Sequence, residues 1–207
     1  MSRKKPALNY PLDFVINKVM EYLNAFEAIN RKRLKGILEN KYKAIPNASE
    51  LMLYMLDKDL CAADRKKEDH GIFNYLLLHK GCSPTMFSQA AFEFFQRRAK
   101  EFNDVVDKSK YPHELQFYAG GKIYLLMHLD NAALQKLTYR STLSAAISDS
   151  EDVVPVFIST ENHQKNASTL RDNPALIPKQ PYIMVYAFWE EGAVKIKYDE
   201  LDGGQNP

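Results

Sequence analysis

The residues best suited to acid–base or nucleophilic chemistry are five histidines and two cysteines. Histidine titrates near neutral pH, and a cysteine becomes a strong nucleophile when its thiol pKa is lowered. No two histidines stand at metal-ligand spacing; they are His70, His79, His113, His128 and His163. Cys82 directly precedes Ser83-Pro84, a typical helix start, where the helix dipole would lower the thiol pKa. A thiol-dependent hydrolase that uses Cys82 is therefore one hypothesis.

Signature motifs of known catalytic sites are missing from the sequence. It has no Gly-rich phosphate loop, no paired-cysteine zinc pattern, no His-Glu-x-x-His and no Gly-x-Ser-x-Gly. The acidic run from Asp149 to Asp152 lacks the spacing of a calcium loop. We therefore expect a protein that is not an enzyme, with no catalytic residue, no cofactor and no bound metal.

Composition is that of an ordinary globular domain. The chain has 207 residues, of which 45% are hydrophobic and 26% charged, enough to form a substantial core. Two cysteines, Cys61 and Cys82, indicate a reducing compartment. No apolar run follows the basic first residues, and none approaches the roughly 18 residues of a membrane span. We expect a cytoplasmic protein without a membrane span; export without a cleaved signal is the alternative.

Basic residues are concentrated in residues 1–43, where they outnumber acidic residues. A basic surface could bind nucleic acid, with tyrosines available for stacking. However, the isoelectric point near 8.3 is modest, and no helix-turn-helix or RNA-binding motif is recognisable. Nucleic-acid binding is the second, less favoured hypothesis. Its candidate residues are Arg3, Lys4, Lys5, Arg31, Lys32, Arg33, Lys35, Lys41 and Lys43, with Tyr10, Tyr22 and Tyr42 among them.

Aromatic residues are abundant, with 11 Phe, 12 Tyr and 1 Trp. Aromatic side chains dominate both cores and protein interfaces. We expect more of them than one core needs, and hence a protein-binding adaptor or chaperone-like subunit of a hetero-oligomeric assembly. Burial in the core is the competing interpretation. The candidate partner-binding residues are Phe87, Phe92, Phe94, Phe95, Tyr182, Tyr186 and Trp189.

Helical periodicity dominates the first half of the chain. Apolar residues every three or four positions predict a helix from Pro11 to Ile29, extended past residues 31–35 to Leu38. A second helix is predicted after Pro46, capped by Asn47 with Glu50 in a capping box. A third is predicted from Ser83, as its N-cap, through Val106, with Tyr111-Pro112 closing it. Residues 63–71 are predicted to form a solvated turn, and residues 72–79 favour helix over strand.

Strand patterns dominate the second half. Gly120-Gly121 predicts a tight hairpin between residues 115–119 and 122–129. A helix from 131 to 147 and a polar break at 148–152 precede a strand at 153–158, in which Pro155 predicts an edge position. Residues 159–181 are predicted to be a long polar loop. A last hairpin joins residues 182–189 to 193–198 through Glu190-Glu191-Gly192.

These elements predict an α+β fold, in which a helical N-terminal half packs on a mainly antiparallel sheet formed by C-terminal hairpins. We expect a flexible basic arm at residues 1–10, a single domain at 11–201 and a flexible tail at 202–207. Two domains that meet near residues 108–113 are the alternative.

The size, the two cysteines, the helix-then-sheet order and the absence of catalytic motifs resemble the LvgA adaptors of the Dot/Icm type IVB secretion system. The resemblance covers the general character of residues 1–207, and no motif in the chain carries it. It implies an adaptor that joins the IcmS–IcmW pair on the coupling complex and helps to recruit effector proteins. No site residue is transferred from that family.

Overall fold

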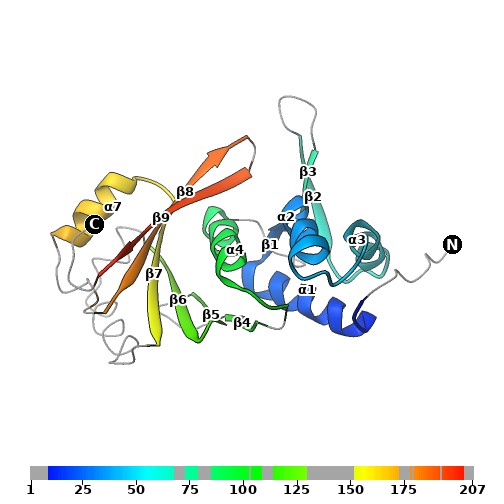
Figure 1. Ribbon diagram of the computed structural model, residues 1–207. Helices are drawn as coiled ribbons and strands as arrows, with labels where there is room; N and C mark the ends of the chain where they lie inside the picture. Colours follow the sequence, from blue (N-terminus) through cyan, green and yellow to red (C-terminus); the bar gives the residue numbers. More distant parts are fainter. Residues whose placement is uncertain are drawn as a thin grey trace.

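The structure is a computed structural model that describes residues 9–67, 73–78, 85–102, 104–108, 114–129, 152–172, 178, 180–191 and 193–202. It has the predicted α+β fold (Figure 1). The N-terminal half contains most of the described helices and a three-stranded sheet. The C-terminal strands form a six-stranded, mostly antiparallel sheet.

The first predicted helix is shorter than expected. α1 spans Leu12–Phe26 and buries one face, including Val15, Val19 and Tyr22. It ends because Glu27 leaves the helical conformation, with φ 61° and ψ −38°, while its N–H still donates to the Leu23 carbonyl at 2.8 Å. The prediction that Ile29 belongs to this helix was wrong, since Ile29 lies in β1 (Ala28–Asn30).

New helix starts explain why one long helix does not form. Asn30 caps α2 (Arg31–Gly36), with its Oδ1 accepting from the Arg33 N–H at 3.2 Å, and the π-helix η1 (Ile37–Lys41) follows. α3 (Ala48–Asp57) begins at Asn47 as predicted. The Asn47 side chain accepts from the Ser49 N–H at 3.2 Å and donates to Glu50 Oε1 at 3.0 Å, so Glu50 contacts the cap side chain instead of closing a capping box.

Two predictions failed in the next segment. The predicted turn at 63–71 contains β2 (Ala62–Lys67), and the apolar run predicted as helix is β3 (Phe73–Leu78). The three strands pair antiparallel in the order β1-β3-β2. A continuous apolar run is typical of a strand with neighbours on both sides, and β3 occupies that central position.

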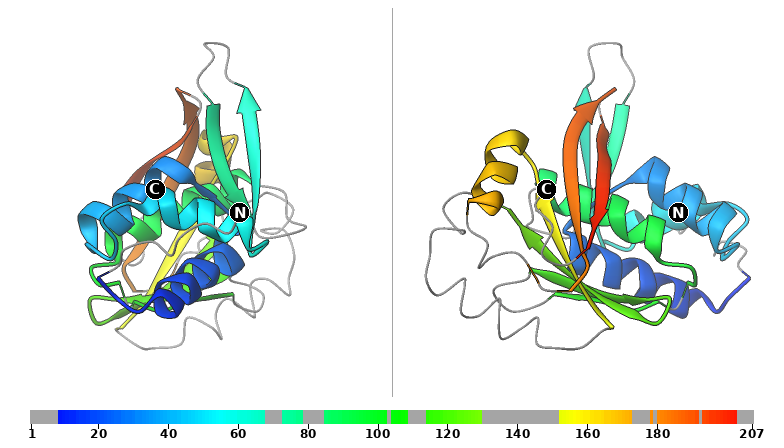
Figure 2. Two further views of the ribbon diagram at one scale, coloured as in Figure 1. Left: turned by 90° about the vertical axis from the view of Figure 1, so that its right-hand side faces the viewer. Right: turned by 60° about the vertical axis from the view of Figure 1, so that its left-hand side comes forward.

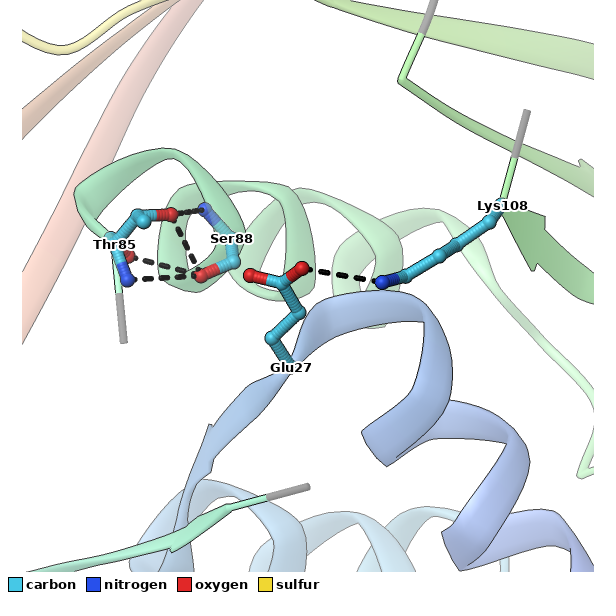
Figure 3. A network of polar contacts seen from close by, with 4 residues as sticks. All are labelled: Glu27, Thr85, Ser88 and Lys108. Atoms are coloured by element: carbon cyan, nitrogen blue, oxygen red, sulfur yellow. Dashed lines mark hydrogen bonds and ion pairs between the residues drawn. The ribbon is translucent and has the colours of Figure 1, made fainter. Parts of the chain in front are cut away.

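α4 (Met86–Arg98) begins at Thr85, not at the predicted Ser83, which lies outside the described residues. Thr85 Oγ1 accepts from the Ser88 N–H at 3.0 Å, and Ser88 Oγ accepts from the Thr85 N–H at 3.2 Å (Figure 3). This capping box fixes Thr85 as the N-cap of α4. α4 ends at Arg98 because Ala99 is extended, so the prediction that it continues to Val106 was wrong. Val106 begins β4 (Val106–Lys108), and the predicted closure at Tyr111-Pro112 lies outside the described residues.

The six-stranded sheet has the order β4-β5-β6-β7-β8-β9. Both predicted hairpins are confirmed: β5 (Leu115–Ala119) with β6 (Lys122–His128), and β8 (Tyr182–Glu190) with β9 (Ala193–Leu201). Gly120 and Gly121 have φ angles of 59° and 80°, as a tight turn requires. β7 (Val153–Ser159) lies between the hairpins and pairs parallel with β6 and β8.

The edge position predicted from Pro155 was wrong. The carbonyl of Asp152 accepts from the N–H of Ile123 on β6, and that of Ile158 accepts from the N–H of Leu129, just after β6. Since main-chain groups alternate sides along a strand, Pro155 directs its nitrogen away from β6, towards β8. Pairing with β8 begins only at Val156, so the missing N–H interrupts no ladder bond.

The predicted loop at 159–181 contains α7 (His163–Arg171). The helix predicted at 131–147 lies outside the described residues, as do residues 148–151 of the predicted polar break. None of the helices in the described part of the chain combines the length and apolar character needed to cross a membrane.

The sheet is covered on both faces. α4 lies on one side of strands β7–β9 and α7 on the other (Figure 1). One core joins α1, α3 and α4 to the sheet, and a smaller core joins α7 to the opposite face through Phe157, Leu170 and Met184. At the junction, Lys108 Nζ on β4 contacts Glu27 Oε1 after α1 at 3.1 Å (Figure 3). The β2–β3 and β8–β9 hairpins extend on the same side of the molecule (Figure 2).

Candidate interaction surfaces

The four phenylalanines predicted to bind a partner are buried inside the chain. Phe94 and Phe95 are 0% exposed, and Phe87 and Phe92 are also buried. Phe95 has rings on three sides, with centroids 5.2 to 5.3 Å away in Tyr22, Phe26 and Phe117. α4 packs against both the N-terminal helices and the sheet, which requires an apolar surface on more than one side. The prediction that these side chains offer a partner surface is therefore corrected: they form the core.

The three candidates on β8 lie in different environments. Tyr182 is buried, with its ring 5.8 Å from that of Phe157 in the smaller core. Tyr186 is half-buried beside His163, at 5.7 Å between ring centroids, and burial raises the pKa of Tyr186. Trp189, near the end of β8, is 51% exposed. Of the seven predicted residues, Trp189 is the one with a largely accessible side chain.

An aromatic recess of about 600 Å³ opens where the start of α1 meets the end of η1 and the chain after α4. It is lined by Tyr10, Pro11, Phe14, Lys41, Tyr42, Lys100, Glu101 and Phe102. Phe102 is the centre of the ring cluster, with centroids 5.6 Å from Tyr10, 5.6 Å from Phe14 and 5.4 Å from Tyr42. Tyr10 and Phe14 are 42% and 38% exposed, so the rings face solvent. Sequence reasoning missed Phe14 and Phe102 as candidates.

The polar groups of this recess have defined states. The Lys41 ammonium donates to the carbonyls of Gln96 and Ala99 at the end of α4, where helix carbonyls lack internal partners. Burial lowers the pKa of Lys41, an effect that Asp104 partly offsets. Burial also raises the pKa of Tyr42 above its ordinary value. Lys100 and Glu101 complete the rim with one charge of each sign.

A second recess, the basic groove, lies between α2 and β9 and encloses about 390 Å³. Its lining is Asn30, Lys32, Arg33, Gly36, Ile37, Lys41, Gln96, Glu191, Ala193 and Lys195. Arg33, one of these lining residues, has its Nε 2.6 Å from Glu93 Oε1 on α4, and the Glu93 side chain is almost fully buried. Burial raises the pKa of Glu93, while Arg33, Arg97 and Lys195 partly offset the shift.

The structure brings together only part of the predicted basic set. Lys32, Arg33 and Lys41 line the basic groove, together with Lys195, which sequence reasoning did not select. Arg3, Lys4 and Lys5 lie outside the described residues. Of the three tyrosines predicted for stacking, Tyr22 is fully buried and Tyr42 is nearly so, whereas Tyr10 is exposed.

Several predicted chemical groups lie outside the described residues, namely Cys82, His70, His79 and His113. Cys61 is a buried thiol. His128 Nε2 lies 2.9 Å from Thr160 Oγ1, and His163 Nδ1 lies 2.9 Å from Ser159 Oγ. In the described part of the chain, no three His, Cys, Asp or Glu side chains are grouped as metal ligands.

The Ser159–His163 pair stabilises the turn between β7 and α7. Ser159 is fully buried, and its hydroxyl donates to the Glu161 carbonyl at 3.2 Å while accepting from Asn166 Nδ2 at 2.9 Å. Asn166 also donates to the carbonyls of Leu129 and Glu161. A nucleophilic serine needs an accessible oxygen and a histidine oriented by a third group. Here the asparagine binds the serine, so these bonds hold the turn in place.

Comparison with known proteins gives no match to a family model, to a curated protein or to a solved structure. The resemblance to the Dot/Icm adaptors therefore stays a prediction.

Proposed function

We propose that the chain is a non-enzymatic protein-binding adaptor and that the aromatic recess is its main contact site. The observation that carries the proposal is the group of solvent-facing rings of Tyr10 and Phe14 around Phe102. Exposed rings lose apolar contact with water when a partner covers them, which favours association. Aromatic residues are also enriched among the side chains that contribute most to binding energy.

The recess suits an apolar or aromatic side chain of a partner protein. Its volume of about 600 Å³ is that of a typical binding pocket, and four of its eight lining residues are aromatic. Lys100 at the rim would favour a carboxylate or carbonyl next to the inserted side chain. The partner is thus expected to present an apolar anchor flanked by an acceptor group.

The proposal is tested with paired baits. Phe14→Ser removes one exposed ring of the recess. The control, Tyr118→Ser, removes a ring on β5; Tyr118 is 53% exposed and lines neither recess. We expect the native chain and Tyr118→Ser to capture the same stoichiometric partner from native lysate, and Phe14→Ser to lose it. Both variants should keep the native circular dichroism spectrum, because each changes a surface residue.

The same baits also define what contradicts the proposal. Recovery of no stoichiometric partner by the native chain, with the purified chain monomeric, argues against an adaptor. If the native chain and Phe14→Ser recover equal amounts of the partner, the chain can still be an adaptor, but the aromatic recess is not its contact site.

The secretion-system form of the proposal has a narrower test. The resemblance to the Dot/Icm adaptors predicts a complex with the IcmS–IcmW pair. Co-expression followed by size-exclusion chromatography should give one peak that contains all three chains. Elution of this chain separately from the pair would remove the secretion role.

A further inference from the structure

The basic groove gathers cationic side chains from two elements that are distant in the sequence. Lys32 and Arg33 come from α2, and Lys195 comes from β9. α4 lies between these elements and contributes Gln96 to the lining (Figure 1). A concave site lined mainly by one sign of charge concentrates ligands of the opposite sign.

The cations of the groove differ in how far they are neutralised. Arg33 is held by Glu93 at 2.6 Å, which orients the guanidinium. Lys195 Nζ is 4.0 Å from Glu190 Oε2, the outer limit of an ion pair, and both groups are exposed enough for the pair to contribute little. Lys32 makes no ion pair with any residue that the structure describes. Two ammonium groups thus remain available on opposite walls.

We propose that the basic groove binds an acidic, extended segment of a partner protein, with carboxylates on Lys32 and Lys195. The proposal rests on the protein-binding function and adds the chemistry of the partner. β9 is the terminal strand of the sheet, so an extended chain can lie alongside it. The amide side chains of Asn30 and Gln96 are positioned in the lining to bond with a peptide backbone.

Groove composition favours an acidic peptide over a nucleic acid. Glu191 lines the groove, and Glu190 lies beside Lys195. A phosphate backbone carries a charge at every nucleotide and would be repelled by these carboxylates. An extended peptide directs alternate side chains to opposite sides, so it can place its carboxylates only next to the ammonium groups of Lys32 and Lys195.

Trp189, the one tryptophan in the chain, does not report on this groove. Lys195 pairs in register with Phe188, whereas Trp189 pairs with Val194. Successive side chains of a strand point to opposite faces, and paired residues share a face, so Trp189 lies on the face opposite Lys195. Binding at the groove is therefore followed through a dye on the peptide.

The test titrates a dye-labelled, amidated peptide of alternating Glu and Ser with the full chain, and follows the fluorescence anisotropy of the dye. We expect a saturable rise in anisotropy that weakens as salt is raised. The double variant Lys32→Glu and Lys195→Glu should weaken binding at least about tenfold. Lys122→Glu changes an exposed lysine at the start of β6, outside the groove, and should bind as the native chain does. Lys32→Gln, a milder change, should give an intermediate loss.

Three results would overturn the proposal. One is the absence of a saturable rise in anisotropy with the acidic peptide at low salt, and another is equal binding of a Lys-Ser peptide. Tighter binding of single-stranded oligothymidylate would assign the groove to nucleic acid instead. Phe14→Ser should bind the acidic peptide as tightly as the native chain does. Loss of the protein partner at the aromatic recess can therefore be distinguished from loss of peptide binding at the basic groove.

Discussion

Glu93 is the residue at which burial and charge pairing oppose each other most clearly. It is 4% exposed and contacts Arg33 at 2.6 Å, with Arg97 and Lys195 also acting on it. Burial nevertheless raises the pKa of Glu93 above its ordinary value of 4.5. A buried ion pair of this kind gives weak net stabilisation, because desolvation offsets the attraction.

The pH dependence of stability should show this raised pKa. Between pH 4.5 and the folded-state pKa, the folded chain binds the Glu93 proton more tightly than the unfolded chain does. The free energy of unfolding of the native chain therefore falls in this window as pH rises. Glu93→Gln cannot ionise, so its stability relative to the native chain should increase with pH. Urea unfolding across this range measures the difference.

The control for this prediction is Glu190→Gln, which removes an exposed carboxylate at the end of β8. A rise in relative stability with pH as large as that of Glu93→Gln would contradict the role given to the buried carboxylate. So would a relative stability of Glu93→Gln that falls as pH rises.

Individual residues with one strong conformational preference were predicted correctly from the sequence. Asn47 begins a helix because its side chain caps the N–H of Ser49, and Gly120-Gly121 turn the chain because glycine adopts positive φ without strain. The edge position inferred from Pro155 was wrong for a physical reason. A proline can lie inside a sheet when its nitrogen is directed to a side where no ladder hydrogen bond is needed. That direction is set by register, which the residue itself does not encode.

At the scale of elements, glycines in different backbone conformations should respond oppositely to the same substitution. Gly36 ends α2 with helical angles, and an added Cβ would meet no atom within 4 Å. Gly36→Ala should raise the free energy of unfolding by about 0.5–1 kcal/mol, because alanine loses less backbone freedom on folding. Gly121 has φ 80°, which is unfavourable for alanine, so Gly121→Ala should lower the free energy of unfolding by about 1 kcal/mol or more.

Urea midpoints of the two glycine variants against the native chain measure both effects. A loss of stability in Gly36→Ala, or none in Gly121→Ala, would contradict the helical and turn conformations that the structure gives these positions.

Elements that depend on distant pairing could not be predicted from local pattern. β2 carries a run of charges that is typical of a turn, yet it pairs with β3 from Ala62↔Leu78 to Lys67↔Phe73. β3 has an apolar run that periodicity cannot distinguish from a helix. α7 begins at His163 because the buried Ser159–Asn166 contacts fold the preceding turn, and Asn166 also binds the carbonyl of Leu129, just after β6. Each of these elements is decided by tertiary context.

At the scale of the whole molecule, the high aromatic content is explained mainly by the packing of α4 between two layers. Phe95 contacts rings of both the helical half and the sheet, and Phe94 contacts rings of the sheet. The aromatic recess could not be predicted from the sequence because its lining comes from residues 10–14, 41–42 and 100–102. The basic groove was predicted only on its α2 side, since Lys195 reaches it from the far end of the chain.

The shared core leads to a prediction about cooperativity that tests the single domain expected at residues 11–201. The larger core is continuous from Val15 on α1 to Ile196 on β9, with Phe95 in contact with both halves. Denaturation followed by far-UV circular dichroism, which reports mainly the helices, and by Trp189 emission, which reports the sheet, should give coincident curves. Phe95→Ala should lower stability by about 3–5 kcal/mol and move both curves together. Separate midpoints, or a shift of one curve alone, would favour two domains that meet near residues 108–113.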